Sequence, residues 1–230
     1  MEREKSDRVR DYDQKINRER EEIKKLNKQI ADLKIWCIQL NHNDQDKNFA
    51  KRFTYQQEID FLVSHERRNA FIKNLAVDLK GNTLLLFVYI EKHGKILYDM
   101  INEQVIGTRK VFFVHGGVDA AAREEVRKIT ETETNAIIVA SFGTFATGTN
   151  IRNLHNVVFA SPAKSRIRNL QSIGRGLRRS DTKDFCDLYD ISDNLTWKSK
   201  KNHTWLHMIE RVKIYAEEQF NYTIAKVNLK

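Results

Sequence analysis

The 230-residue sequence is poor in three residue types, with one proline, nine glycines and two cysteines. Two cysteines are too few for a disulfide framework. Cys37 and Cys186 both lie in apolar, strand-like runs, so we expect buried thiols in a reducing compartment. No apolar run approaches the roughly 18 residues of a transmembrane helix, and the charged N-terminus has no hydrophobic signal core. We therefore expect a cytoplasmic protein without a membrane segment.

Positive charge is abundant. Lysine and arginine number 40 against 31 acidic residues, for a net charge of +9 and a pI of about 9.5. This balance suits a polyanionic partner, although many soluble proteins are equally basic. A hydrophobic content of 40% with helix and strand patterning indicates a globular chain.

Residues 1–34 are highly charged and carry a heptad pattern. Val9, Ile16, Ile23 and Ile30 recur every seven residues, and the alternate core position has one fault, at Glu19. The pattern predicts a long N-terminal helix or a coiled coil, with a possible partner helix along residues 5–34. The alternative is a linker helix that folds onto its own domain.

The next segment, residues 35–82, reads as a strand and helices that lead into the main domain. We expect an outer strand at 35–40, a polar loop at 41–48, and a helix over 53–80 with a break near Ser64 and His65. Gly81 and Asn82 then provide the stop signal.

From residue 83 to 230, strand and helix patterns alternate. The run 83–89 is continuously apolar, as expected for a parallel strand covered on both faces. Asp119 can cap the helix that follows the strand at 110–114. Further strands are predicted at 136–140, 156–160 and 184–190, and helices at 166–178 and 203–219. The class is α/β: a doubly wound, largely parallel sheet with helices on both faces.

One loop resembles a phosphate-binding loop but lacks its key residue. Gly143 and Gly148 have the spacing of a P-loop, yet Thr149 and Asn150 stand where lysine and Ser or Thr are needed. No Asp-Glu box that would hold magnesium follows a strand. The chain is therefore expected not to bind and hydrolyse a nucleotide alone.

Two neighbouring motifs carry a family resemblance. Residues 171–178, with the pattern Gln-x-x-Gly-Arg-x-x-Arg, resemble motif VI of superfamily 2 helicases, and residues 140–151 resemble motif V. Residues 153–158, 164–165 and 211–222 are similar to the UvsW-type recombination helicases of T-even phages. The resemblance covers roughly residues 35–230. It implies a RecA-like fold in which residues 83–230 form the helicase C-terminal domain.

The resemblance also implies catalytic roles around motif VI. Arg175 and Arg178 lie three residues apart on a predicted helix, so they share a face. A guanidinium can stabilise the charge that develops on a transferring γ-phosphate. Arg178 is expected to be the arginine finger with Arg175 beside it. Gln171 would help position the γ-phosphate or link to the other domain, and Gly174 would allow close approach to the nucleotide. The alternative is a DNA-facing basic helix.

The motif V loop is expected to contact both nucleic acid and nucleotide. Its hydroxyls can hold phosphate oxygens, and Gly148 permits close backbone approach. Asn150 falls where many relatives carry aspartate. The predicted nucleotide-binding residues are Gly148, Asn150 and Gly174. The predicted DNA-binding residues are Ser141, Thr144, Thr147, Thr149, His115, Gly116, Arg123, Lys164 and Arg166.

The resemblance implies the C-terminal motor half of an ATP-dependent DNA helicase that acts on forks, Holliday junctions and R-loops in recombination and repair. ATP and Mg²⁺ would be bound mainly by an N-terminal motor domain, in cis or in trans. The location would be the host-cell cytoplasm if the chain is phage-encoded. The alternatives are a non-catalytic module that binds DNA and recruits a partner, and an unrelated doubly wound enzyme. His42, His203 and His207 show no metal-ligand spacing, and we expect them to be structural.

Overall fold

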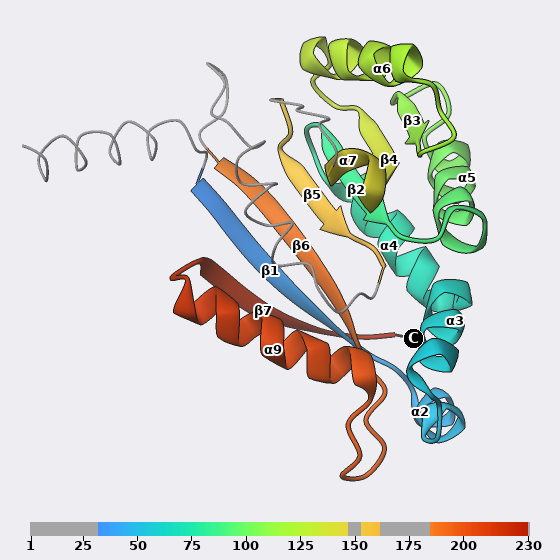
Figure 1. Cartoon of the computed structure of the whole chain (residues 1–230), viewed down its shortest axis with the longest axis vertical. Helices are drawn as coiled ribbons and strands as arrows, with labels where there is room; N and C mark the ends of the chain where they lie inside the picture. Colours follow the sequence, from blue (N-terminus) through green and yellow to red (C-terminus); the bar gives the residue numbers. More distant parts are fainter. Residues whose placement is uncertain (1–31, 147–152, 162–184, 230) are drawn as a thin grey trace, which may run out of the picture.

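The computed structural model describes residues 32–146, 153–161 and 185–229. In these ranges seven strands form one sheet in the order β3-β4-β2-β5-β6-β1-β7 (Figure 1). Every neighbouring pair is parallel. The strands are β1 Asp32–Asn41, β2 Thr83–Phe87, β3 Val111–Val114, β4 Ile137–Ser141, β5 Asn156–Phe159, β6 Phe185–Asn194 and β7 Asn221–Asn228. The helices are α2 Asp44–Ala50, α3 Tyr55–Ser64, α4 Glu66–Asp78, the π-helical turn η1 Ile90–Gly94, α5 Lys95–Gln104, α6 Ala120–Thr132, α7 Phe142–Ala146 and α9 His203–Glu217.

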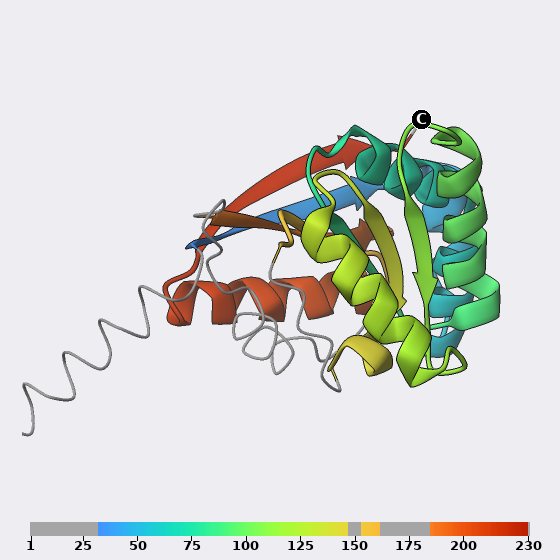
Figure 2. The same cartoon turned by 90° about the horizontal axis from the view of Figure 1, so that it is seen from above.

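Successive strand residues point to opposite faces of the sheet, and both faces are covered. Leu84 and Leu86 of β2 belong to a buried cluster that includes Met208 and Tyr215 of α9. The intervening Leu85 belongs to the cluster on the other face, with side chains of α4 and α5. Figure 2 shows α9 and α4 on opposite sides of the strands. The predicted doubly wound, parallel α/β fold is confirmed. The predicted N-terminal helix over 1–34 lies outside the described residues except at 32–34, where the prediction is wrong because these residues begin β1.

The prediction that residues 35–40 form an outer strand is wrong. β1 pairs with β6 on one side and with β7 on the other. Its apolar side chains are buried on both faces, with Ile35, Cys37 and Leu40 fully inaccessible. The edge strand on this side of the sheet is β7, an unpredicted strand with a largely exposed pattern. One sheet therefore contains strands from both predicted segments, 35–82 and 83–230.

Capping explains the helix boundaries around residues 43–65. The predicted loop at 41–48 is wrong in part, because α2 begins at Asp44. Its N-cap Asn43 accepts a hydrogen bond from the Asp46 backbone N–H at 2.9 Å. The predicted break near Ser64 and His65 is confirmed. His65 ends α3 and caps α4, with Nδ1 accepting from the Arg68 N–H at 3.3 Å.

Two further local predictions are confirmed. The Asp119 carboxylate accepts from the Ala122 N–H at 2.9 Å and caps α6. Cys37 and Cys186 are buried free thiols. Burial, reinforced by the charge of Asp190, raises the pKa of Cys37 to about 12, so this thiol stays protonated. Across the described ranges, none of the helices has the length and apolarity to span a bilayer.

Buried polar groups attach α9 to the rest of the fold. The Glu58 carboxylate of α3 accepts hydrogen bonds from the backbone N–H groups of His203 and Thr204, at 2.9 and 2.8 Å. These donors are the unpaired N–H groups at the start of α9, so a buried carboxylate is well placed there. Further along the helix, the Arg211 guanidinium donates to both oxygens of Asp190 in β6, at 2.7 and 3.0 Å.

Candidate nucleic-acid interface

The candidate interface lies at the carboxyl edge of the sheet, where all parallel strands end. β3, β4, β2 and β5 are consecutive neighbours, so the loops that follow them lie next to one another. In register, Val114 pairs with Ala140, and Phe87 pairs with Ser141. The fold therefore brings the loops after residues 114, 141, 87 and 159 to one edge, which is where open α/β sheets bind ligands.

The first part of the motif V loop is a short, hydrogen-bonded turn. Ser141 ends β4 and Thr144 lies in α7, with their hydroxyl oxygens 2.8 Å apart. The Thr144 N–H also donates to Ser141 Oγ at 3.4 Å. Both residues are largely buried. The pair therefore fixes the direction in which the motif V segment leaves the sheet.

His115 and Gly116 follow the neighbouring strand β3. His115 Nδ1 accepts from the Gly117 N–H at 3.1 Å, and its ring lies 5.0 Å from that of Phe113. In the neutral ring this bond places the proton on Nε2, which is then a donor. Gly116 is exposed, and a Cβ there would meet nothing within 4 Å. Internal packing therefore does not require a glycine at position 116.

Arg123 lies near the start of α6, beyond the same loop. Its backbone N–H donates to the carbonyl oxygen of Asp119 at 3.2 Å. The side-chain Nε is buried and has no hydrogen-bond partner among the described residues. Arginine binds phosphate through its planar guanidinium, so Arg123 stays a candidate contact, while its buried Nε is not itself exposed to a ligand.

Sequence reasoning missed the joint between the loops after β2 and β5. The Val88 N–H donates to Ser161 Oγ at 3.0 Å, and His93 Nδ1 lies 2.9 Å from the same oxygen. The joint includes the π-helical turn η1, a feature often found at functional sites. At Gly94, an added Cβ would lie 2.5 Å from the Phe87 ring, so any other residue would require this ring or the turn to shift. A π-helical turn leaves no periodic pattern in a sequence. Gly94 is the residue of η1 whose type reflects the local packing.

Lys92 in the same turn already has an acidic partner. It forms an ion pair with Asp60 of α3 and lies 4.6 Å from the centre of the Tyr89 ring. Their hydrogen bond raises the pKa of Lys92 and lowers that of Asp60. Because its charge is balanced, Lys92 is a weaker phosphate ligand than an unpaired base.

Asn82 anchors the far end of the motif V segment. This fully buried amide donates to the carbonyl oxygens of Thr130, Glu133 and Asn153, at 3.0, 2.6 and 2.8 Å. Its own oxygen accepts from the Ala136 N–H at 2.8 Å. Asn153 is the first described residue after motif V, so the segment is held on both sides.

The other predicted site residues lie outside the described residues, and their roles remain predictions. They are Thr147, Gly148, Thr149, Asn150, Lys164, Arg166, Gln171, Gly174, Arg175 and Arg178.

Residues 66–180, half of the chain, match the family described as the Helicase conserved C-terminal domain. The chain belongs to this family. It is 36% identical over 214 residues to the ATP-dependent DNA helicase UvsW of Enterobacteria phage T4, an alignment that covers 87% of this chain and 42% of UvsW. The predicted resemblance to UvsW-type helicases is confirmed.

Solved structures agree with this assignment. The crystal structure of T4 UvsW superimposes with a TM-score of 0.77 at 36% identity, over 86% of this chain and 42% of that one. The C-terminal domain of the DEAD-box protein Dbp5 gives a TM-score of 0.52 at 11% identity, over 87% of this chain and 91% of that one, and shows the fold alone. The chain thus spans less than half the length of UvsW.

Proposed function

We propose that this chain is the C-terminal motor half of an ATP-dependent DNA helicase that acts on branched DNA in recombination and repair. The observation that carries the proposal is the 36% identity to an ATP-dependent DNA helicase over 87% of the chain. The carboxyl edge supports it, because motif V begins there beside the loops after β3 and β2.

ATP and Mg²⁺ are proposed to bind mainly to an N-terminal motor domain, in cis or in trans. Thr149 and Asn150 replace the lysine and hydroxyl residue of a P-loop. The described start of motif V offers the hydroxyls of Ser141 and Thr144, not the paired carboxylates that hold Mg²⁺. No magnesium step is therefore assigned to this chain, and we expect little ATPase activity from it alone.

Motif VI is proposed to complete the ATPase site across the cleft between the two motor domains. Arg178 acts as the arginine finger, Arg175 supports it, and Gln171 helps to position the γ-phosphate. Such a guanidinium contributes about 10³–10⁵ to kcat in related phosphoryl-transfer enzymes.

DNA is proposed to run along the carboxyl edge. Two side-chain donors lie in and after the loop that follows β3, the Nε2–H of His115 and the guanidinium of Arg123. Gly116 lets a strand approach closely, since no neighbouring side chain needs the space. These are phosphate contacts, so binding should weaken steeply with salt.

The deciding experiment is an ATPase assay with this chain and a matching N-terminal motor domain, with and without branched DNA. Wild type is compared with Arg178→Ala and with Arg179→Ala, a neighbouring arginine outside the Gln-x-x-Gly-Arg-x-x-Arg pattern. We expect activity that needs both proteins and DNA, falls at least about 10³-fold in Arg178→Ala, and persists in Arg179→Ala.

Two other outcomes would change the proposal. If Arg178→Ala keeps the same ATPase activity as Arg179→Ala, Arg178 would be assigned to DNA binding. DNA binding without ATPase activity in any mixture would favour the non-catalytic module that recruits a partner.

A further inference from the structure

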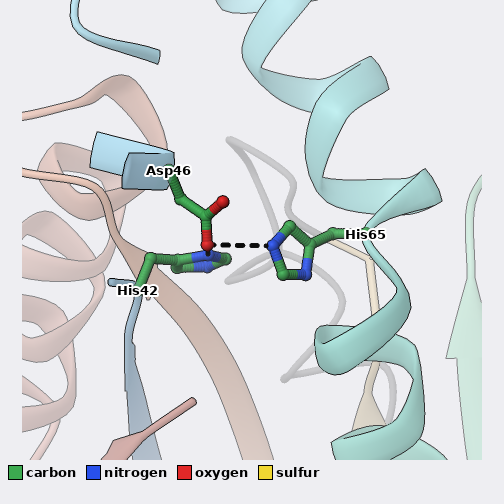
Figure 3. A group of neighbouring side chains, drawn as sticks. All are labelled: His42, Asp46 and His65. Carbon is green, nitrogen blue, oxygen red and sulfur yellow. Dashed lines mark hydrogen bonds and ion pairs between the residues drawn. The ribbon is translucent and has the colours of Figure 1, made fainter. Parts of the chain in front are cut away.

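Three side chains of metal-ligand type converge at the carboxyl end of β1, away from the motif V loop. His42 directly follows β1, Asp46 lies on α2, and His65 joins α3 to α4 (Figure 3). Asp46 Oδ2 lies between the two rings, 3.8 Å from His42 Nδ1 and 3.2 Å from His65 Nε2. All three ligand atoms are within 4.8 Å of one another.

The orientation of His42 is fixed by a buried carboxylate. His42 Nε2 lies 3.0 Å from Asp193 Oδ1, and both side chains are fully buried. Asp193 also accepts from Arg68 Nε through both oxygens, at 3.0 and 2.9 Å, so it is ionised and His42 Nε2 must be the donor. In the neutral ring the lone pair is then on Nδ1, which points toward Asp46.

That lone pair has no hydrogen-bond partner in the described part of the chain. A buried acceptor without a partner is unfavourable and uncommon. A histidine that donates one ring N–H to a carboxylate and presents the other nitrogen to a shared point is the arrangement found around protein-bound metals. The carboxylate holds the tautomer and makes the free nitrogen a stronger ligand.

We propose that His42 Nδ1, Asp46 Oδ2 and His65 Nε2 bind one Zn²⁺ ion, with water as the fourth ligand. Zinc bonds of about 2.0–2.1 Å in a tetrahedron place ligand atoms about 3.3 Å apart. The observed 3.2 and 3.8 Å are close to this spacing, and the two histidine nitrogens, which lie within 4.8 Å of each other, must move closer together when the ion binds. Two imidazoles with one carboxylate select zinc over Mg²⁺ and Ca²⁺, which prefer oxygen ligands.

Zinc binding changes the tautomer of His65. Without metal, His65 Nδ1 accepts from the Arg68 N–H at 3.3 Å, so the ring proton lies on Nε2 and faces Asp46. When Nε2 binds zinc, the proton moves to Nδ1 and this helix-capping bond opens. Two long hydrogen bonds, from the Arg68 N–H and to Asp46 Oδ2, are exchanged for a metal bond, and no proton is gained or lost by the ring.

The ion would cross-link the end of β1, α2 and the α3–α4 junction. The network also extends toward motif VI, because Arg68 Nη2 donates to the Ala160 carbonyl oxygen at 2.8 Å. Ala160 directly follows β5 and precedes the segment that carries Gln171 and Arg178. We therefore assign the metal a structural role that stabilises this side of the carboxyl edge.

The test is a Zn²⁺ titration of the chelator-treated full chain by calorimetry, with Co²⁺ absorption to report tetrahedral coordination. The variants are Asp46→Asn, and His65→Asn, which removes the ligand but keeps a residue that caps α4 well. The matched control is Asp44→Asn, an exposed carboxylate on the same helix. His203 and His207 lie one turn apart on α9 and could also bind Zn²⁺. They are replaced together by Gln to test whether they bind the ion instead.

We expect one Zn²⁺ per chain, with affinity at least tenfold lower in both ligand variants and unchanged in the Asp44 and α9 controls. Zinc at 100 times its Kd should raise the wild-type Tm by about 5–10 °C, and should not raise that of Asp46→Asn. Circular dichroism without metal verifies that the variants fold.

Three results would overturn the site. They are the absence of binding at about 100 μM Zn²⁺, equal affinity in wild type and Asp46→Asn, or loss of binding in the α9 variant alone.

Discussion

Replacing Arg68 with methionine should destabilise the fold strongly. Arg68 and Asp193 are fully buried, and the guanidinium also binds the Ala160 carbonyl oxygen. Arg68→Met leaves the Asp193 carboxylate buried. Of its two side-chain partners, Arg68 and His42, only His42 then remains. Removing one partner of a buried ion pair costs about 3–5 kcal/mol. A domain of this size is stabilised by about 5–15 kcal/mol in total, so the Tm should fall by about 6–20 °C.

Urea unfolding measures the free energy of unfolding and the coupling between the two sites. The proteins compared are wild type, Arg68→Met, Asp193→Asn and the double variant. Because Asn carries no charge, the double variant should be less destabilised than the sum of the single variants, by at least about 1 kcal/mol. A cost below about 1 kcal/mol for Arg68→Met, or strict additivity, would refute the reasoning.

The same pair predicts a pH dependence with a definite sign. Burial alone would raise the pKa of Asp193, but the charge of Arg68 and the hydrogen bond with His42 outweigh it and lower the pKa. A lowered pKa contributes stability that is fully present above the unfolded value of about 3.9 and is lost as the pH falls through the folded pKa. The cost of Arg68→Met should therefore shrink as the pH falls below about 4, as measured by urea unfolding at each pH.

Three more substitutions test other parts of the carboxyl edge and its anchors. Asn82→Ala removes a donor from three carbonyls, of which Glu133 keeps the Asn153 side chain as a donor, and removes the acceptor of one N–H. It should cost about 3 kcal/mol or more in urea unfolding, and Asn82→Asp should cost more because a carboxylate repels those carbonyls. Equal stability of wild type and Asn82→Asp would contradict this. Gly94→Ala places a Cβ against the Phe87 ring and should cost about 1–3 kcal/mol, part of which Phe87→Leu should restore; a neutral Gly94→Ala would show that η1 adapts. Arg123→Ala should lower the slope of log affinity for DNA against log salt by about 0.9, measured by fluorescence anisotropy, and an unchanged slope would remove Arg123 from the interface.

The strands of the central sheet were predictable because parallel strands are buried on both faces. Leu84, Leu85 and Leu86 form an unbroken apolar run, and all three are inaccessible in the structure. Local capping signals also succeeded, since Asp119 needs only the next three residues to close the first turn of α6. Such features depend on neighbours in the sequence.

Features that depend on distant pairing were not predictable. β1 reads as a strand, but its position between β6 and β7 is fixed by partners more than 150 residues away. β7 itself has weak patterning because one side of it faces solvent. The same limit applies to the His42, Asp46 and His65 cluster. His65 was predicted only as a helix break. Nothing in the sequence around His42 indicates that Asp193 orients its ring.

The position of β1 has a consequence for how the chain assembles during synthesis. β1 is made first among the described strands, yet its partners β6 and β7 follow about 150 and 190 residues later. At about 5–20 residues per second, β1 waits roughly 8–30 s for β6. During this interval β2, β3, β4 and β5 can already pair with one another. The nascent chain therefore passes through a stage in which a preformed central sheet coexists with an apolar β1 that has no partner. Among the described strands, β1 is the one that waits longest for its partners.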